Sequence, residues 1–479
     1  MATGRPFLTA GRWQQTATTT KILNPFNGDI VAEVCQAGAG DLEVAVQSTL
    51  EGARVMRDFP GHLRSSLLQK VSVLLDARAE EIARTIMAEG GKPITDARRE
   101  VSRAVHTFSI AAEEAKRIAG EMLPLDWTPA TEAHWGLTRR FPIGPILGIT
   151  PFNFPLNLVA HKVAPALAAG NAILIKPAPQ TPLTALLLGE VIMEAGFPEG
   201  AVNIVPCSNP IAERLVTDPR FKLLSFTGSA AVGWMLKGKS GKKKVVLELG
   251  GNAGVIVEPD ADLDWAAQRC ASGGFVYAGQ TCISVQRILV HESIADAFTK
   301  KLLALVALVK TGDPADDATV VGPLIDSSAT RRVESWIQEA VAQGARVLAG
   351  GARKESILEA TVMSQVTPSM KVSCEEVFGP LVTVTPYRQF EQAVAMMNNS
   401  PYGLQAGIFS QDVNRLFAAF RDLEVGAVLA NEIPTFRAEH MPYGGVKDSG
   451  LGREGVRYAI EEMTEPRLLV LNLRRPPTA

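Results

Sequence analysis

The stretch "GPILGITPFNFPLNLVAHKVAPALAAGNAILIKPA", residues 144–178, decides the expected fold. Its apolar runs "ILGI" and "AILI" have the length of strands, whereas "LNLVAHKVAPALAAG" between them has the length of a helix and ends in glycine. Two short apolar runs joined by a helical segment are typical of parallel strands with a crossover helix. The stretch therefore predicts a parallel β-α-β unit.

The alternation of strand and helix patterns continues to about residue 258. "TALLLGEVIMEAG" and "AERLVTD" predict helices, and "VNIVPC", "FKLLSFTGS" and "KKKVVLELGG" predict strands. Together these patterns predict a doubly wound parallel sheet in an α/β domain. After Gly251 the alternation starts again with "NAGVIVEP", "LDWAAQRCASGGFV" and "QRILVHESIADAFTKKLLALVALV", which indicates a second α/β domain.

The segments on either side of this region have different patterns. "KILNPFNGDIVAEV" predicts strands around turns, because N-P and N-G separate its β-branched runs. Residues 41–118 have helical spacing, with Asp41 as the expected first N-cap and Gly90-Gly91 as a helix stop. "EPRLLVLNLR" (465–474) is strand-like but has no local partner, so we expect it to join another sheet or another subunit.

Composition excludes several classes of protein. The chain has 479 residues, 46% of them hydrophobic, which is enough for two or three domains. Its 48 Lys and Arg nearly balance its 50 Asp and Glu, so the net charge of −2 gives no reason to expect nucleic acid or a membrane as partner. The five scattered cysteines predict no disulfide framework and no metal site, and they suit the reducing cytoplasm. The N-terminus has no signal-peptide pattern.

Three side chains are candidates for catalysis. Cys282, in "FVYAGQTCIS", could be a nucleophile, although cysteine is more often a buried structural residue. Glu248 ends the strand pattern "VVLELGG", where it could act as a general base or could be a capping or surface residue. Asn153 lies between prolines in "TPFNFPLN", so its amide could form part of an oxyanion hole or could simply occupy a turn.

Two further motifs could bind phosphate or ribose. Gly228 and Ser229, in "SFTGSAAVG", follow a strand and begin a helix, where backbone N–H groups can meet a phosphate. Lys176, at the end of "NAILIKPA", could hold a ribose or phosphate or could be a solvated strand-end lysine. The pattern G-x-G-x-x-G is absent from this turn.

Each motif is weak alone, but their order resembles that of the aldehyde dehydrogenase superfamily. The resemblance runs from about residue 20 to the C-terminus and rests on "PFNFP", "KPAPQTP", "FTGS", "LELGG", "GQTC", "EEVFGP" and "PYGGVKDSGLGREG". It implies that Cys282 attacks an aldehyde to give a thiohemiacetal, whose oxyanion is held by Asn153 and by the backbone N–H of Cys282. Hydride transfer to the nicotinamide then leaves a thioester, and Glu248 activates the water that hydrolyses it to the acid.

The same resemblance implies a site for NAD or NADP. The residues implied to contact the cofactor are Thr150, Pro151, Phe152, Lys176, Pro179, Gly228, Ser229, Gly250, Glu376 and Phe378. Members that prefer NAD often carry Glu at the position of Pro179, for the ribose 2′-hydroxyl. Proline neither bonds that hydroxyl nor repels a 2′-phosphate, so NADP is a plausible cofactor and the choice stays open.

Substrate preference rests on three residues. Arg437 stands where relatives that oxidise neutral aldehydes often carry an aromatic residue, and Arg103 could join it in binding an anionic tail. Arg437 could instead pair with Glu439 or Asp448 at a loop. Thr281 stands beside the nucleophile, where relatives that act on phosphorylated aldehydes often carry Arg. We therefore expect a short polar or acidic aldehyde of the lactaldehyde, glycolaldehyde or semialdehyde type.

The family layout implies the domains and the assembly. It implies a Rossmann-type cofactor domain over 1–119 and 143–250, and a catalytic α/β domain over 251–445. It implies a β oligomerisation segment over 120–142 and 464–479, and so a homodimer or homotetramer.

Two other functions compete with aldehyde oxidation. A thiol hydrolase or acyltransferase would pair Cys282 with His161 or His440. A non-catalytic descendant of the enzyme would be expected to have lost Cys282, Glu248 or Asn153, and all three are present.

Overall fold

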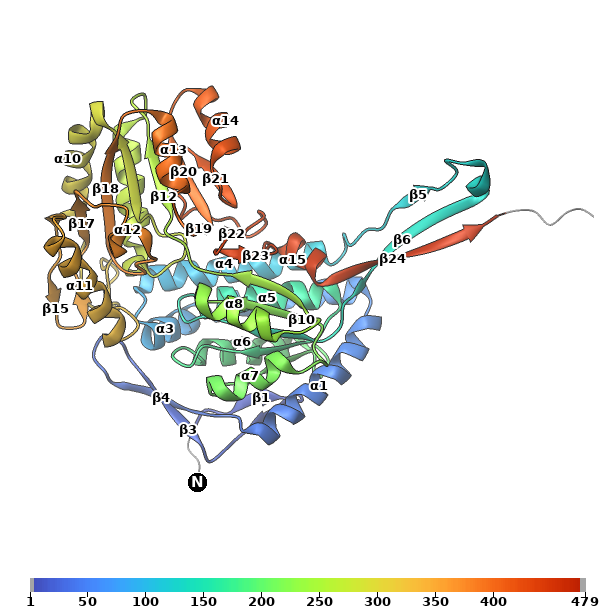
Figure 1. Ribbon diagram of the computed structural model, residues 1–479. Helices are drawn as coiled ribbons and strands as arrows, with labels where there is room; N and C mark the ends of the chain where they lie inside the picture. The colour runs from blue at the N-terminus through green and yellow to red at the C-terminus, as the bar shows by residue number, and fades with distance from the viewer. Residues whose placement is uncertain (1–3, 474–479) are drawn as a thin grey trace, which may run out of the picture.

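The chain forms two large α/β bodies and a projecting arm of strands (Figure 1). The computed structural model describes residues 4–473. One body is built around an eight-stranded sheet, the other around a seven-stranded sheet, and the arm is a three-stranded sheet. The domain boundaries given above stay a prediction, and residues 1–3 and 474–479 of the predicted segments lie outside the described residues.

The eight-stranded sheet has the doubly wound order predicted from the alternation of patterns. Its five central strands run parallel in the order β9-β8-β7-β10-β11, so the chain starts in the middle and winds outward in both directions. The winding reverses between β7 and β10, and a crevice is expected beyond the carboxyl ends of strands at such a point. In sheet order the strands are β2 (Arg12–Gln14), β1 (Phe7–Thr9), β9 (Val202–Ile204), β8 (Ile173–Lys176), β7 (Ile146–Ile149), β10 (Leu223–Thr227), β11 (Lys244–Glu248) and β23 (Gly450–Leu451).

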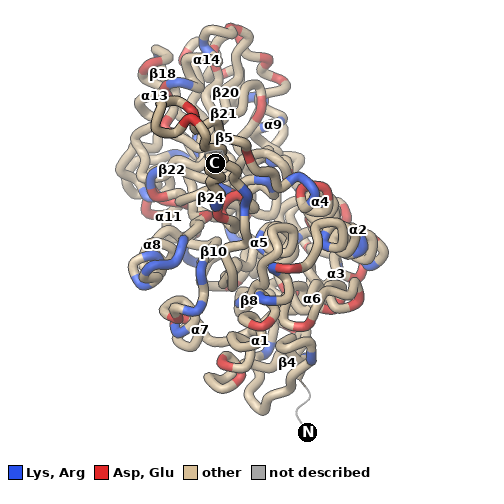
Figure 2. Tube along the Cα trace, turned by 90° about the vertical axis from the view of Figure 1, so that its right-hand side faces the viewer, with Lys and Arg blue, Asp and Glu red and all other residues tan. Residues whose placement is uncertain are grey.

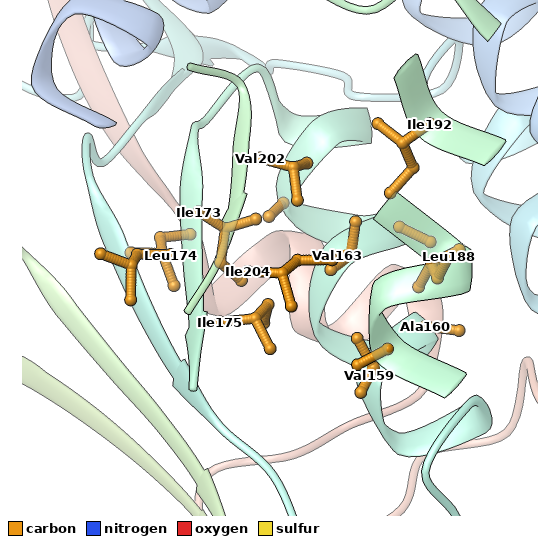
Figure 3. Packing of buried hydrophobic residues seen from close by; sticks show 14 of the residues in the cluster. Val159, Ala160, Val163, Ile173, Leu174, Ile175, Leu188, Ile192, Val202 and Ile204 are labelled. Carbon is orange, nitrogen blue, oxygen red and sulfur yellow. The ribbon is translucent and has the colours of Figure 1, made fainter. Parts of the chain in front are cut away.

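Helices cover this sheet and share its core. All residues of the helix α5 are buried, which explains its nearly uninterrupted apolar sequence. In Figure 3, α5 presents Val159 and Val163 toward Ile204 and Ile175 of the neighbouring strands. The helices of this body are α1 (Ala39–Asp58), α2 (Gly61–Ala77), α3 (Ala79–Gly90), α4 (Ile94–Glu114), α5 (Asn157–Ala169), α6 (Leu183–Ala195), α7 (Asn209–Thr217) and α8 (Ala230–Lys239).

The seven-stranded sheet begins after the "LELGG" motif, in agreement with a second α/β unit. All its neighbouring strands pair in parallel except β14 with β17. In sheet order the strands are β14 (Arg346–Ala349), β17 (Thr361–Ser364), β18 (Leu381–Tyr387), β13 (Arg287–His291), β12 (Gly254–Val257), β20 (Gln405–Phe409) and β21 (Ala427–Ala430). Its main helices are α9 (Leu263–Phe275), α10 (Ala295–Val306), α11 (Ser327–Ala342), α13 (Phe390–Asn398) and α14 (Val413–Asp422).

The strand-like tail pairs within its own chain. β24 (Thr464–Asn472) runs antiparallel to β6 (His134–Pro142) along its whole length, and β5 (Met122–Pro124) flanks β6. These three strands form the arm that extends away from both bodies in Figure 1. The tail therefore joins another sheet, which is one of the two outcomes expected for it.

The stretch between residues 446 and 463, which no predicted domain contains, returns to the first body. β23 pairs antiparallel with β11 at the edge of the eight-stranded sheet. The helix α15 (Val456–Glu462) follows and packs near α5. This return brings the "PYGGVKDSGLGREG" motif back to the end of the strand that carries Glu248.

Two local expectations for the N-terminal helices have clear outcomes. Gly91 ends α3 in the left-handed conformation at φ 65°, so the predicted stop is confirmed. Asp41 as N-cap is wrong, because α1 begins at Ala39 and Gly38 is its N-cap. The Asp41 carboxylate instead accepts a hydrogen bond from the Gly38 N–H at 2.8 Å, from inside the first turn.

The described part of the chain is mixed in charge. Figure 2 shows basic and acidic residues interspersed along the trace. Within residues 4–473, no helix has both the length and the apolar character needed to cross a membrane.

Candidate active site

A cavity of about 520 Å³ is lined by residues from both bodies. Most of the predicted site residues line it, while Thr150, Lys176 and Pro179 lie outside its lining. The predicted residues that line the cavity are Arg103, Pro151, Phe152, Asn153, Gly228, Ser229, Glu248, Gly250, Thr281, Cys282, Glu376, Phe378 and Arg437. The turns after β7 and β10 and the end of β11 supply many of them, so the cavity lies at the predicted crevice of the first sheet.

The loop that carries Cys282 has an unusual backbone. After α9, Tyr277, Ala278 and Gly279 all have positive φ, at 50°, 51° and 70°. A Cβ on Gly279 would lie 2.1 Å from the carbonyl oxygen of Gly379, so only glycine fits there. The buried Gln280 side chain then accepts the Ile325 N–H at 2.9 Å, which ties the loop to the second body. Consecutive left-handed residues are costly and are tolerated where the surroundings hold them.

Asn153 is fixed against this same loop. Its side chain is buried, and Nδ2 donates to the carbonyl oxygen of Gln280 at 3.0 Å. An amide nitrogen carries two hydrogens, so the second one remains for another acceptor. Asn153 therefore does more than occupy a turn, because its amide is held two residues from Cys282.

Cys282 is part-buried, and its sulfur has one hydrogen-bond partner among residues 4–473. Sγ lies 3.1 Å from the phenolic oxygen of Tyr443. Burial raises the pKa of the Cys282 thiol to about 12, so a base or a hydrogen-bond donor is needed to favour the thiolate. Tyr443 was not predicted as a site residue, although it lies in the quoted motif "PYGG".

Glu248 is buried at the end of β11, with 3% of its surface exposed. Both of its carboxylate oxygens lack a hydrogen-bond partner among the described residues. Burial, followed by the negative charge of Glu454, raises the pKa of the Glu248 carboxyl well above its usual value. The surface and capping interpretations are therefore wrong, and an unpartnered carboxyl of raised pKa faces the cavity that contains Cys282.

Arg437 belongs to a buried network of charges. Its Nη2 donates to Glu454 Oε2 at 3.2 Å, and Lys162 Nζ lies 3.1 Å from Glu454 Oε1. Burial opposes ionisation of Glu454, but the two cations lower its pKa to about 2. The pairing of Arg437 with Glu439 or Asp448 is therefore wrong, since Glu454 is its partner. Nε of Arg437 is buried without a partner among the described residues.

Glu439 belongs to a second cluster. It accepts from Arg103 Nε at 2.5 Å and lies 2.5 Å from Nε2 of His161. The pKa of His161 is lowered, and burial of the ring is the largest cause. Neither His161 nor His440 lines the cavity, and His440 is exposed, so the geometry gives no support to a Cys-His pair.

The residues predicted to contact the dinucleotide include a helix N-terminus and a glycine pair. Ser229 is the N-cap of α8 and its side chain makes no capping hydrogen bond. The Glu376 carboxylate accepts the Gly251 N–H at 2.9 Å, and burial raises its pKa to about 7. A Cβ on Gly250 would lie 2.4 Å from that carboxylate, so glycine keeps the space open. A helix N-terminus beside a glycine pair fits a pyrophosphate and its riboses.

Two other predicted cofactor residues have defined contacts. Lys176 is buried at the end of β8 and donates to Asn209 Oδ1 at 3.0 Å. Phe378 has a φ of 46° and meets Phe152 edge to face, with ring centroids 5.9 Å apart. Among the described residues there is no group of three or more His, Cys, Asp or Glu that could hold a metal ion.

Comparison with known proteins identifies the family. Residues 13–469 match the sequence model of the aldehyde dehydrogenase family. The chain belongs to the aldehyde dehydrogenase family. The expectation of an oxidoreductase of this family is therefore confirmed.

Relatives of this aldehyde dehydrogenase are similar over nearly their whole length. It is 43% identical to a 3-sulfolactaldehyde dehydrogenase of Priestia megaterium over 464 residues, covering 97% of each chain. It is 44% identical to aldehyde dehydrogenase 21 of Physcomitrella patens, solved with the reaction product succinate, with a TM-score of 0.96 and 98% of each chain covered. An NADP-dependent glyceraldehyde-3-phosphate dehydrogenase of Bacillus halodurans, solved with NADP, matches at TM-score 0.96 and 35% identity, covering 98% of this chain and 100% of that one. The predicted fold class is confirmed by these structures.

Proposed function

We propose that this aldehyde dehydrogenase oxidises a short aldehyde with a polar or acidic tail to its carboxylic acid, using NAD or NADP. One observation supports this most directly: the cavity that holds Cys282 and Glu248 also holds Arg437, whose buried Nε has no partner among the described residues. A buried unpartnered N–H of a guanidinium favours a ligand that accepts hydrogen bonds there, and an anion most of all.

The chain's own residues account for the reaction at the aldehyde. Cys282 Sγ attacks the carbonyl carbon, and the oxyanion accepts hydrogen bonds from the free N–H of Asn153 and from the Cys282 backbone. The nicotinamide cofactor, when bound, supplies the hydride acceptor for this oxidation. Glu248 then takes a proton from a water molecule, which attacks the resulting thioester and releases the acid.

The tail of the substrate would meet arginine side chains. Arg437 and Arg103 both line the cavity, whereas Thr281 beside the sulfur carries no charge. The relative named for 3-sulfolactaldehyde and the neighbour solved with succinate both handle compounds with an anionic tail. A sulfonate or carboxylate tail is therefore our preferred substrate class.

NADP is as suitable as NAD on the residues present. Pro179 leaves no carboxylate to repel a 2′-phosphate, and the neighbour from Bacillus halodurans was solved with NADP.

The experiment is a substrate panel with both cofactors. The panel contains sulfolactaldehyde, succinate semialdehyde, lactaldehyde and propanal, each tested with NAD and with NADP. The rate of formation of reduced cofactor is measured by its absorbance. We expect the anionic aldehydes to have the higher kcat/KM. Cys282→Ala should abolish the signal, whereas Cys374→Ala, at a part-buried cysteine outside the cavity, should keep it. Folded protein that reduces neither cofactor with any aldehyde would contradict the proposal.

We also propose a cytoplasmic homodimer or homotetramer. All five cysteines are unpaired, which suits a reducing compartment. In the arm, β24 exposes Leu468, Leu469 and Val470, an apolar surface that a second copy of the chain could cover. Light scattering on the purified protein measures the assembly, and a monomer at micromolar concentration would contradict it.

A further inference from the structure

Tyr443 lies beside the sulfur that the proposed function uses as nucleophile. Its phenolic oxygen is 3.1 Å from Cys282 Sγ, and the residue is 3% exposed. Its backbone exchanges two hydrogen bonds with Glu454, at 3.0 Å and 2.6 Å. Its ring packs with Ile283 and Leu404. The phenol is therefore held in place rather than free to swing into the cavity.

A cation lies over the face of this ring. The guanidinium carbon of Arg437 is 3.7 Å from the centre of the Tyr443 ring, and Glu454 holds the guanidinium there. A cation at this distance is attracted to the ring and withdraws electron density from it. The hydroxyl thereby becomes a better hydrogen-bond donor and a poorer acceptor.

Either atom of this pair could donate the hydrogen bond, and the cation over the ring favours the phenol as the donor. A thiol could donate to the phenol, or the phenol could donate to the sulfur. We propose that Tyr443 is a catalytic residue that donates its hydroxyl hydrogen bond to Cys282 Sγ and stabilises the thiolate, with Arg437 as the positioning residue that strengthens this donor. The inference deepens the proposed function, because it rests on Cys282 as the nucleophile.

Other charged groups around the sulfur do not replace this donor. The titratable groups that act on Cys282 are Tyr443, Glu376, Arg437 and Glu248. The two carboxylates disfavour a thiolate, whereas Arg437, which is stacked on the Tyr443 ring, favours it. Among the described residues, the hydroxyl of Tyr443 is the hydrogen-bond partner of Sγ, at 3.1 Å.

The test measures the thiolate without any aldehyde. Alkylation of Cys282 by iodoacetamide is followed between pH 7 and 10 by mass spectrometry of its peptide. Tyr443→Phe keeps the ring and removes the hydroxyl, and we expect its alkylation at each pH to be about tenfold slower, equivalent to a thiol pKa about one unit higher. Tyr387→Phe is the matched control, because its buried hydroxyl donates to Val257 O at 3.1 Å and the residue lies outside the cavity. Its alkylation profile should overlay that of the parent.

The opposite hydrogen bond predicts the opposite result. If the thiol donates to the phenol, Tyr443→Phe loses an interaction that favours the neutral thiol, and alkylation becomes faster. Faster or unchanged alkylation in a variant that melts with the parent's profile overturns the inference. Arg437→Met provides a second variant, in which the hydroxyl stays and the cation is removed. Arg437→Met should also slow alkylation of Cys282, but by less than Tyr443→Phe does. Faster alkylation in Arg437→Met would contradict the role of the cation in strengthening the Tyr443 donor.

Turnover separates this role from substrate binding. Tyr443→Phe should lower kcat/KM for propanal and for succinate semialdehyde by the same factor, because both need the thiolate. A loss confined to the anionic aldehyde would assign Tyr443 to the tail and overturn the inference. If the parent oxidises no aldehyde while the alkylation shift is present, the proposed function fails and the hydrogen bond stands.

Discussion

Arg437 donates from Nη2 to Glu454 Oε2 across 3.2 Å, while its buried Nε has no partner in the part of the chain that the structure describes. The guanidinium side chain is only 6% exposed, so water does not replace the missing acceptor freely. One side of the guanidinium is thus neutralised by the protein and the other is left for a ligand. That division makes Arg437 both part of a buried charge network and the proposed anchor for an acidic tail.

Arg437→Leu should change the preference for acidic aldehydes. The ratio of kcat/KM for succinate semialdehyde to that for propanal should fall about 10- to 100-fold, since a hydrogen bond to a charged group contributes about 1.5–3 kcal/mol. Steady-state kinetics on the two aldehydes measure the ratio. Arg421→Leu, at an exposed arginine paired with Asp422, is the control and should leave the ratio unchanged. An unchanged ratio in Arg437→Leu would remove its anchor role.

Glu248→Gln should separate the two halves of the reaction. The amide cannot take a proton from water, so thioester hydrolysis should slow by about 100-fold or more. Rapid mixing should then show a burst of reduced cofactor, close to one per active site, followed by slow turnover. Steady-state hydrolysis that survives intact would mean that Glu248 is not the base.

The pH dependence of hydrolysis should follow Glu248. Burial raises the pKa of its carboxyl above the usual value, so the group is protonated and inactive as a base below that raised pKa. Deacylation should therefore increase as pH rises above the usual pKa of glutamate, and the residual rate of Glu248→Gln should not show this increase. A parent enzyme whose deacylation rate is flat over this range would contradict the assignment.

Glu454→Gln should destabilise the fold. Lys162 and Arg437 are buried and would both lose their counterion, a loss of about 3–5 kcal/mol in the free energy of unfolding. Urea denaturation measures this loss. Glu391→Gln, at an exposed carboxylate, is the control and should change the free energy of unfolding by less than about 0.5 kcal/mol.

The ion pairs of Glu454 with Lys162 and Arg437 should also make the unfolding free energy depend on pH in acid. The folded pKa of Glu454 is lowered to about 2, below its usual value, because Lys162 and Arg437 outweigh burial. Its contribution is therefore present above the usual pKa of glutamate and is lost as pH falls toward 2. The difference in unfolding free energy between the parent and Glu454→Gln should shrink over that range, and a constant difference would contradict this account.

Local patterns were sufficient to predict the strands and helices of the parallel region. The strand and helix boundaries of the parallel region depend on apolar periodicity, and the sequence order of Asn153, Glu248 and Cys282 indicated a site before any contact was known. The first N-cap was misplaced because Asp41 and Gly38 both suit the start of a helix, and the two positions are three residues apart.

The sequence by itself determined the parallel sheets and the family, because these follow from spacing and order along the chain. Only the tertiary structure decided which polar groups meet. Tyr443 and Cys282 are 161 residues apart, and Lys162 and Glu454 are 292 residues apart. These pairs form because β23 returns to the edge of β11 and the second sheet presents the Cys282 loop at the crevice of the first. Such contacts depend on how the two bodies pack, and no local periodicity carries that information.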